Sequence, residues 1–340
     1  MTFQRNKLSK WVGTYFKDDK FEIEFLAGDA SFRRYYRIKR GSNTYVLMDA
    51  SSEKEKLTQF LKIGKLFREN GVITPLVIYS NLEDGISLLS DFGDQLLIDN
   101  FQKNKEISSY KNCLDELIKI NQIKSKIIPS YTHEKLIEEM TRMQDWFFEL
   151  LKIKLSKSDK VILANLFDQL ASALKSEPQV CLHRDYHCKN IMPLGNDLSK
   201  IGIIDFQDAV CGPVTYDLVS LLKDCYIDWP KDETLTWVKY YFNLLREKEL
   251  ISESISFKQF LMWFDLTGLQ RHIKCLGIFS CLYIRDGRSQ YLEYLPRVFN
   301  YILSASKDYE ALKDWNELLI EKIKPQFDQL NLNYLKSLAS

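Results

Sequence analysis

Several features that would identify a particular class of protein are scarce or absent in this sequence. It contains only 13 glycines and 8 prolines, without a proline- or glycine-rich linker or a low-complexity tract. Because such tracts form flexible tethers between domains, we expect any two lobes of this chain to be packed together. No internal repeat of fixed period is visible along the chain.

Long apolar runs and an excess of one charge are absent as well. No run approaches the length that spans a membrane, and residues 1–10 are polar and lack the apolar core of a signal peptide. The chain carries 47 basic and 46 acidic residues, which argues against a nucleic-acid partner and against an acidic surface dedicated to polycations. We therefore expect a cytoplasmic protein with no membrane or nucleic-acid partner and no obligate protein partner.

The cysteines do not form a recognisable framework. There are seven of them, an odd number, and no two are arranged as C-x-x-C. In a reducing compartment this pattern indicates buried thiols and not disulfides. The 340 residues are many for one hydrophobic core and sufficient for two lobes, and a composition of 45% hydrophobic and 27% charged residues is typical of a globular protein.

The apolar pattern changes near Gly93. Before it, strands are predicted at residues 21–25, 35–39, 44–49, 72–79 and 86–89, and one helix at 53–70. After it, short apolar strands are predicted only at 180–182 and 201–204. The rest is helical, at 107–123, 133–153, 157–175, 216–225, 235–246, 257–282, 292–304 and 309–335. The prediction is an α+β fold with a small strand-rich lobe, residues 1–93, and a large, mainly helical lobe, residues 94–340.

One stretch carries a recognisable set of chemical groups. Residues 183–190 read HRDYHCKN, and a second carboxylate, Asp205, follows on an apolar strand. The spacing H-R-D-x-x-x-x-N is the catalytic-loop signature of kinases. In that signature Asp185 accepts or orients the proton of a hydroxyl, while oxygen atoms of Asn190 and Asp205 hold Mg²⁺. The sequence therefore predicts phosphoryl transfer from ATP with Mg²⁺.

Two other interpretations of nearby residues are weaker. A zinc site is conceivable because the ligand types are present at Cys181, His183, His187 and Cys188. However, no second cluster completes the spacing of a zinc finger. A literal D-F-G at residues 91–93 precedes the catalytic loop, whereas the metal-binding Asp of a kinase follows it. We therefore expect residues 91–93 to connect the lobes, and Asp205-Phe206-Gln207 to replace the D-F-G.

These residues resemble the aminoglycoside phosphotransferase superfamily, small-molecule kinases with a two-lobed protein-kinase-like fold. His187 stands where that family typically has His and protein kinases have Lys, and the gap between Asp205 and Asp217 is too short for an activation segment. Further blocks resemble a subgroup, the anomeric kinases of N-acetylmuramate and N-acetylglucosamine in bacterial cell-wall recycling. These blocks lie at residues 28–37, 46–50, 204–210, 216–226, 265–272, 277–279 and 285–287.

The resemblance implies where the nucleotide binds. Residues 28–36, including Ser31 and Phe32, would form the turn over the ATP phosphates, although an ordinary polar hairpin is the plain alternative. The lobe connector with Asp91 and Phe92 is assigned to the same site. Kinases hold the phosphates with a Lys on the third strand, but Met48 stands near that place here. We expect Arg34 or Arg37 to supply the cation, unless the strand arginines, Arg33 included, form a solvated face.

The acceptor site is predicted from residue chemistry. Carboxylates suit sugar hydroxyls, aromatic rings suit sugar rings, and Arg271 could bind the lactyl carboxylate of N-acetylmuramate. Each of these candidates could equally be structural: His187, Asp208, Asp224, Tyr226, Trp229 and Arg271. The predicted activity is phosphorylation of the anomeric hydroxyl of one or both amino sugars. The alternatives are a kinase of choline, homoserine or an aminoglycoside, and a nucleotide-binding pseudokinase.

Overall fold

A computed structural model describes residues 2–28, 33–99, 107–195 and 200–330 of the chain. These residues form two compact units. The first comprises Met1–Gln95 and Met192–Gln207, and the second comprises Leu96–Ile191 and Asp208–Ser340. The chain therefore returns to the first unit after the catalytic loop, and this return segment carries Asp205. The assignment of nucleotide binding to residues 1–93 and of catalysis to residues 94–340 stays a prediction.

The first unit is built on an antiparallel sheet in the order β1-β2-β3-β5-β4. Its strands are β1 (Glu22–Ala27), β2 (Arg34–Arg40), β3 (Asn43–Asp49), β4 (Val77–Asn81) and β5 (Ile86–Ser90). Strands β2 and β3 form a hairpin in which Arg40 pairs with Asn43. The predicted strand at 72–79 was wrong in its first half. Pro75, which has no backbone N–H to offer a strand, lies in that half.

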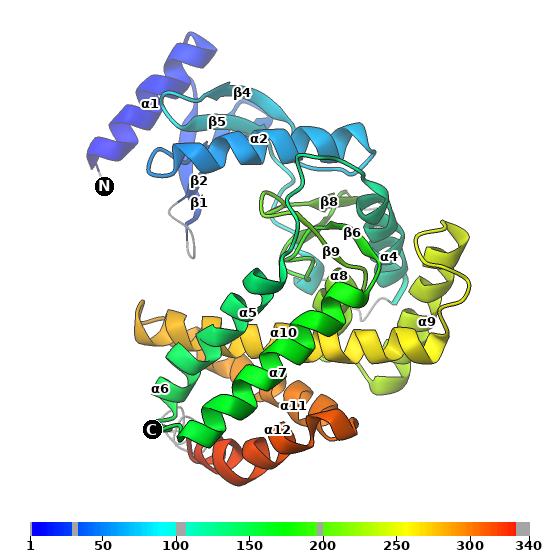
Figure 1. Ribbon diagram of the computed structural model, residues 1–340. Coiled ribbons are helices and arrows are strands. Elements are labelled where there is room, and N and C mark those ends of the chain that lie inside the picture. The colour runs from blue at the N-terminus through cyan, green and yellow to red at the C-terminus, as the bar shows by residue number, and fades with distance from the viewer. Residues whose placement is uncertain (1, 29–32, 100–106, 196–199, 331–340) are drawn as a thin grey trace. The chain divides into compact units, whose positions relative to one another are not determined.

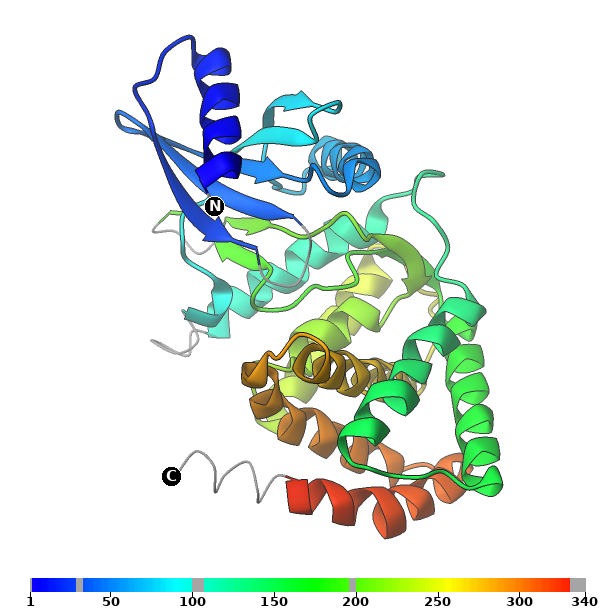
Figure 2. The same cartoon turned by 90° about the vertical axis from the view of Figure 1, so that its left-hand side faces the viewer.

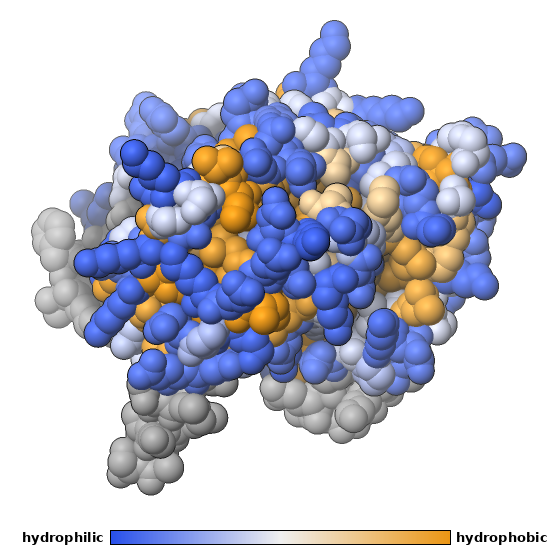
Figure 3. Space-filling view, turned by 60° about the horizontal axis from the view of Figure 1, so that its bottom comes forward, coloured by the Kyte–Doolittle hydropathy of each residue, from blue (hydrophilic) through white to orange (hydrophobic). Residues whose placement is uncertain are grey.

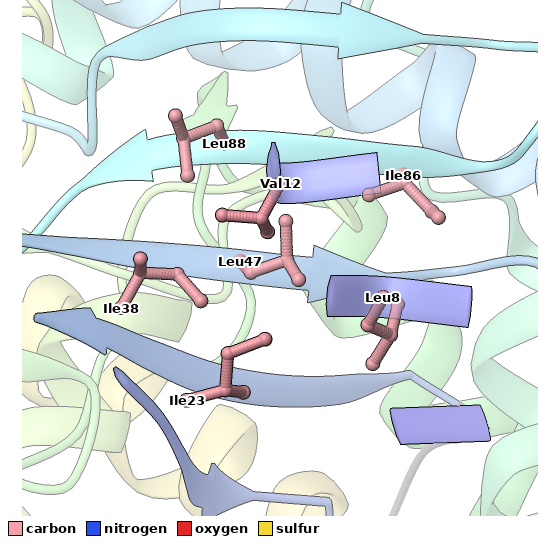
Figure 4. Packing of buried hydrophobic residues seen from close by; sticks show 7 residues of the cluster. All are labelled: Leu8, Val12, Ile23, Ile38, Leu47, Ile86 and Leu88. Atoms are coloured by element: carbon pink, nitrogen blue, oxygen red, sulfur yellow. The ribbon is translucent and has the colours of Figure 1, made fainter. Parts of the chain in front are cut away.

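A helix that was not predicted covers one face of this sheet (Figures 2 and 4). Helix α1 (Thr2–Phe16) places Leu8 and Val12 against the sheet. The facing side chains come from four strands and are Ile23, Ile38, Leu47, Ile86 and Leu88. Burial of each such side chain contributes about 1.5–3 kcal/mol, so this contact is a substantial part of the core of the first unit. The polar residues around Leu8 and Val12 hid the helix in the sequence.

Helix α2 (Lys54–Glu69) and the return segment form a second contact in the first unit. The return segment contains most of β7 (Ile191–Pro193) and all of β8 (Ile201–Ile203), which pair with each other. Phe206 is fully buried and stacks on Phe60 with ring centroids 4.8 Å apart. A Cβ on Gly64 of α2 would lie 3.0 Å from the Phe206 ring, so any larger residue would require the ring to shift. This packing anchors the residue that follows Asp205.

The second unit is mainly helical (Figures 1 and 2). Its α-helices are α4 (Ile107–Gln122), α5 (His133–Arg142), α6 (Phe148–Leu150), α7 (Lys157–Ser176), α8 (Tyr216–Leu222), α9 (Lys231–Glu247), α10 (Phe257–Ile284), α11 (Leu295–Ser306) and α12 (Lys313–Leu318). Short π-helical turns η1 (Met143–Phe147) and η4 (Leu319–Ile323) and 3₁₀ turns η2 (Ser289–Tyr294) and η3 (Glu310–Leu312) extend them. Strands β6 (Gln179–Leu182) and β9 (Val210–Pro213) pair antiparallel, and β9 was not predicted.

Helix α10 is the central element of the second unit and packs on α5, α7, α8 and α11. At its crossing with η1, a Cβ on Gly277 would lie 2.4 Å from the Arg142 carbonyl carbon. The two backbones can approach this closely only because residue 277 is glycine. In the described part of the chain, no helix is long and apolar enough to cross a membrane. Helix α10 is long, but it contains Asp265, Arg271 and Lys274.

Polar side chains are spread widely over the face of the molecule shown in Figure 3, with separate apolar patches between them. Exposed apolar residues such as Val161 and Leu235 occur in the second unit. Single exposed residues of this kind are common on folded proteins and need no functional explanation. The fold class predicted from the sequence, a strand-rich part followed by a large helical part, is confirmed.

Candidate active site

The catalytic loop, residues 183–190, follows β6 and is held by a buried carboxylate of α8. Asp217 accepts the backbone N–H of His183 at 2.6 Å and that of Arg184 at 2.9 Å. Arg184 has φ of +76°, a left-handed conformation that a side chain other than glycine adopts only under constraint. The two hydrogen bonds from consecutive N–H groups to one carboxylate provide that constraint. Asp217 therefore positions the residue immediately before Asp185.

Asp185 is half-buried and ionised over the whole physiological pH range. Burial opposes its ionisation, but the positive charges of Lys274, Arg184 and Arg271 outweigh burial and lower the pKa of Asp185 to about 2. A carboxylate with so low a pKa is a weak base but a permanent hydrogen-bond acceptor. Asp185 is therefore suited to orient a hydroxyl group and to receive its proton only late in a reaction.

A buried network surrounds the cations that act on Asp185. Its centre is Glu139 of α5, which pairs with Arg184 and lies 3.1 Å from Lys274 of α10. Tyr131 donates a hydrogen bond to Glu139, and Lys274 donates one of 3.1 Å to Tyr216. We call these five residues the Glu139 network. Glu139 partly neutralises these two cations and so stabilises them in the protein interior. Removing the three charged groups from water costs free energy, and this cost is offset only when all of them are paired.

Asn190 is tied to the backbone of the catalytic loop. Its amide nitrogen donates to the Asp185 carbonyl oxygen at 3.0 Å and lies 3.5 Å from Nε2 of His187. Donation by the nitrogen fixes the plane of the amide and makes Oδ1 the atom that would face a cation. An amide oxygen is a suitable ligand for a hard cation such as Mg²⁺.

His187 and Tyr226 belong to one aromatic cluster in the second unit. The His187 ring lies edge-on to Tyr226 at 5.2 Å, and Tyr226 lies edge-on to Tyr294 of η2 at 4.8 Å. Lys189 lies over the Tyr226 ring, with Nζ 3.9 Å from its centroid. The structure thus brings together two predicted acceptor residues, His187 and Tyr226, and adds Lys189 and Tyr294 to them.

The other predicted acceptor residues have different surroundings. Asp224 is fully buried and accepts the backbone N–H groups of Cys188 at 2.9 Å and of Tyr226 at 2.8 Å, a use that shapes the loops. Arg271 is 4% exposed and its Nη1 lies 3.7 Å from Sγ of Cys225. Asp208 is exposed, and its carbonyl oxygen accepts from Arg184 at 3.4 Å. Trp229 is buried and lies edge-on to Tyr110 at 4.5 Å. Their contacts with a sugar stay predictions.

Asp205 follows β8 in the first unit. Its side chain is 47% exposed and lies 3.9 Å from Nη2 of Arg33, and Oδ1 accepts a hydrogen bond of 2.8 Å from Gln207. Its φ of +62° is left-handed, and the buried ring of Phe206 next to it holds this conformation. An exposed carboxylate supplies the kind of oxygen ligand that Mg²⁺ prefers.

The residues predicted to bind the nucleotide differ in their surroundings. Ser31 and Phe32 lie outside the described residues. Arg34 is exposed. Arg37 pairs with Asp91 through Nε at 2.7 Å and with Asp94 through Nη1 at 2.7 Å, so its charge is already paired within the first unit. The buried arginine beside Asp205 is instead Arg33, which only the alternative interpretation mentions, as part of a solvated face; it is 6% exposed.

Phe92 and Met48 complete the described candidates of the first unit. The Phe92 ring lies against β8, where a Cβ on Gly202 would come within 2.6 Å of it. Met48 of β3 is fully buried and pairs with Tyr35 of β2. A nucleotide role for these residues stays a prediction.

Comparison with known proteins identifies the family of this chain. The model of a family described as "Phosphotransferase enzyme family" matches residues 22–250. The chain belongs to this family. It is 32% identical over 325 residues to the N-acetylmuramate/N-acetylglucosamine kinase of Neisseria meningitidis serogroup B, covering 93% of this chain and 95% of that protein. It is 34% identical to the protein of the same name from Pseudomonas aeruginosa, with 88% of each chain covered.

Solved structures show the same fold for this phosphotransferase. The ADP-bound aminoglycoside phosphotransferase APH(2'')-Ib has a TM-score of 0.60 at 14% identity, over 87% of this chain and 97% of that one. The choline kinase LicA from Streptococcus pneumoniae has a TM-score of 0.61 at 13% identity, over 89% and 99%. At these identities the likeness establishes a kinase-like fold and nothing finer. The family resemblance read from the sequence is confirmed.

Several groups around the site of this phosphotransferase were missed by sequence reasoning. Glu139 and Lys274 lie on helices far from the catalytic loop in sequence, and neither belongs to a continuous motif. One feature of the sequence could have indicated Glu139. It is a charged residue that lies between Leu136 and Met140 on the buried side of α5. Such a residue is buried only where it has a partner.

Proposed function

We propose that this chain is an ATP-dependent kinase that phosphorylates the anomeric hydroxyl of N-acetylmuramate and N-acetylglucosamine. The observation that carries the proposal is the catalytic loop: Asp217 and Asn190 hold its backbone, and the positive charges of Lys274, Arg184 and Arg271 keep the Asp185 carboxylate ionised. Relatives of that name, matched over nearly the whole chain, support the choice of acceptor. The role would lie in the recycling of cell-wall sugars in the cytoplasm.

In the proposed reaction, Asp185 accepts a hydrogen bond from the anomeric hydroxyl. The hydroxyl oxygen forms a bond to the γ-phosphorus of ATP, and the bond from that phosphorus to the β,γ-bridging oxygen breaks, releasing ADP. The hydroxyl proton passes to Asp185 and then to solvent. Because phosphoryl transfer has a loose transition state, orientation of the acceptor contributes more than strong basicity, which fits the low pKa of Asp185.

Asn190 and Asp205 would hold Mg²⁺ through oxygen atoms, and bound Mg²⁺ would offset the negative charge of the phosphates. Each donor is suitable by its own chemistry, because Asn190 donates through its amide nitrogen and leaves Oδ1 as an acceptor, and the Asp205 carboxylate is exposed. Arg33 beside Asp205 is the cation that we propose in place of the missing third-strand lysine. Arginine binds phosphate oxygens in two-pronged geometry, which supports this substitution.

The decisive experiment is a coupled assay of ADP release with purified protein across both amino sugars, choline, homoserine and an aminoglycoside. We expect turnover with one or both amino sugars, and ³¹P NMR of the product should show phosphate on the anomeric oxygen. Turnover with choline, homoserine or the aminoglycoside alone would replace the proposed acceptor. ATP binding without ADP release for every acceptor would indicate a pseudokinase.

The role of Asp185 is tested by Asp185→Asn, with Asp205→Asn as its counterpart. Asp185→Asn should lower turnover by about 10²- to 10⁴-fold, because the hydroxyl loses its acceptor, and should leave the affinity for Mg·ATP unchanged. Asp205→Asn should instead weaken Mg·ATP binding in calorimetry. Full turnover in Asp185→Asn, or wild-type Mg·ATP affinity in Asp205→Asn, would contradict the respective assignment.

A further inference from the structure

Three of the cations around the catalytic loop are paired or buried within the second unit. Arg184 and Lys274 both pair with Glu139. Arg271, which the sequence had suggested as the ligand of a substrate carboxylate, is 4% exposed and directs Nη1 at the Cys225 sulfur. All three charges act on Asp185; Arg184 and Lys274 pair with Glu139, and burial keeps Arg271 away from solvent. An anionic substituent of the acceptor therefore requires another cation.

Lys189, which directly precedes Asn190, is the candidate for that cation. Its Nζ lies 3.9 Å from the centroid of Tyr226, 4.8 Å from the centroid of Tyr294 and 3.2 Å from the Tyr294 hydroxyl oxygen. In the part of the chain that the structure describes, no carboxylate lies within ion-pair distance of this nitrogen. Aromatic faces and a hydroxyl hold an ammonium group without neutralising its charge. The two rings and the hydroxyl therefore fix the position of the Lys189 ammonium group and leave its positive charge to bind an anion.

The Lys189 ammonium is connected to the reacting centre through short contacts within the second unit. Tyr226, the ring beneath Lys189, lies edge-on to His187 at 5.2 Å. His187 Nε2 lies 3.5 Å from the amide nitrogen of Asn190, which donates to the carbonyl of Asp185. One aromatic ring thus separates the ammonium from the residues beside Asp185. Lys189 therefore offers a cation within the same loop, residues 183–190, to an acceptor sugar bound at Asp185.

We propose that Lys189 binds the carboxylate of the lactyl ether of N-acetylmuramate and thereby sets the preference between this acidic sugar and the neutral N-acetylglucosamine. This inference rests on the proposed function. N-acetylglucosamine differs from N-acetylmuramate by the absence of the lactyl ether, so it offers Lys189 no charge. Tyr226 and Tyr294 act as positioning residues, because they restrict the rotamers of a long side chain that would otherwise lose conformational entropy on binding.

The test is the ratio of kcat/KM values for the two sugars in the wild type and in Lys189→Met. For N-acetylmuramate we expect a loss of about ten- to hundredfold, because a hydrogen bond between two charged groups is removed. For N-acetylglucosamine the change should stay within about threefold, since the methionine retains the apolar stem. Lys189→Arg should recover most of the activity on N-acetylmuramate.

Two controls separate recognition from structural damage. Lys111→Met removes a lysine that also lies over a tyrosine ring, at 5.4 Å from the centroid of Tyr240, but pairs with Asp115 on α4. It should change neither activity. The amide of N-acetylmuramate should be a poor substrate of the wild type by the same factor and should be insensitive to Lys189→Met. That non-additivity is the signature of a direct pair.

The outcomes are distinguishable. Equal losses on both sugars in Lys189→Met, or no loss on either, would overturn the role of Lys189 while the proposed function stands. A wild type that phosphorylates N-acetylglucosamine alone would also overturn it. A wild type that phosphorylates neither sugar would refute the proposed function, and the role of Lys189 with it.

Discussion

Glu139 and Glu177 are both buried in the second unit, but the regions around them hold the two carboxyl groups in opposite ways. Burial opposes ionisation of Glu139, yet Lys274, Arg184 and the Tyr131 hydroxyl outweigh it, and the pKa lies below its usual value. Burial raises the pKa of Glu177 to about 7, although hydroxyl groups of Thr267 and Thr215 donate to it. Depth therefore does not decide the charge of a buried carboxyl group; the charge of its partners does.

The two buried glutamates also have different roles. The Glu139 network compensates cations that face Asp185, so it belongs to the electrostatics of the site. Glu177 links the segment before β6, Thr215 before α8 and Thr267 of α10, so it joins elements that surround the catalytic loop without adding charge to it. Three variants test this division, in descending order of expected effect.

The largest effect is expected from Glu139→Gln, which leaves Arg184 and Lys274 buried with no carboxylate in their network. Loss of one partner from a buried ionic group costs about 3–5 kcal/mol, because the remaining charge stays desolvated. Urea denaturation should therefore show a free energy of unfolding lowered by about that amount. The matched control is Glu138→Gln on the same helix; Glu138 is exposed and pairs with Lys135, so its loss should cost under about 1 kcal/mol. Equal losses of stability in both variants would show that the charge of Glu139 does not stabilise Arg184 and Lys274.

The Glu139 network also shows where sequence reasoning reached its limit. Asp185, Asn190 and Asp205 were nominated because the kinase signature is continuous in the chain and ends on an apolar strand. Glu139 and Lys274 come from α5 and α10, and only tertiary packing brings them to the loop. The role of Gly64 was equally hidden, since it depends on the position of the Phe206 ring. Local patterns predicted the fold class and most elements; contacts between distant segments were not encoded in any of them.

The arginines of β2 illustrate the same limit at the scale of one residue. Alternation along a strand tells which side chains share a face, but not which face is buried. Arg37 was a reasonable candidate for a phosphate ligand, and it pairs with Asp91 and Asp94. Arg33 precedes the strand and approaches Asp205. Which of the two arginines lies beside Asp205 depends on the position of the return segment, and no local sequence pattern predicts that position.

The second effect concerns the pH dependence of stability through Glu177. Its folded pKa, about 7, lies above the ordinary value of 4.5, so the folded state binds the proton more tightly than the unfolded state. The contribution of Glu177 to stability is therefore fully present below pH 4.5 and is lost as the pH rises through 7. Between pH 5 and pH 8 the wild type should lose about 2–3 kcal/mol relative to Glu177→Gln, which remains neutral.

Denaturant unfolding of both proteins at several pH values measures this difference, and titrations common to both cancel. Glu138→Gln, which replaces an exposed glutamate, should show no such slope against the wild type. A constant difference between wild type and Glu177→Gln across the range would mean that the buried carboxyl group is ionised throughout, as Glu139 is.

The smallest effect is expected from Thr267→Val, which removes one of the donors to Glu177 with little change in volume. The Thr267 hydroxyl donates to Oε1 of Glu177 at 2.7 Å, and its oxygen lies 3.0 Å from the Thr215 hydroxyl oxygen. At pH 5 the carboxyl group is protonated and the lost hydrogen bond is between neutral groups, worth about 1 kcal/mol. At pH 8 it is ionised and the same bond is worth about 1.5–3 kcal/mol. The cost of the substitution should thus grow with pH; a cost that falls with pH would show that Thr267 stabilises the protonated form instead.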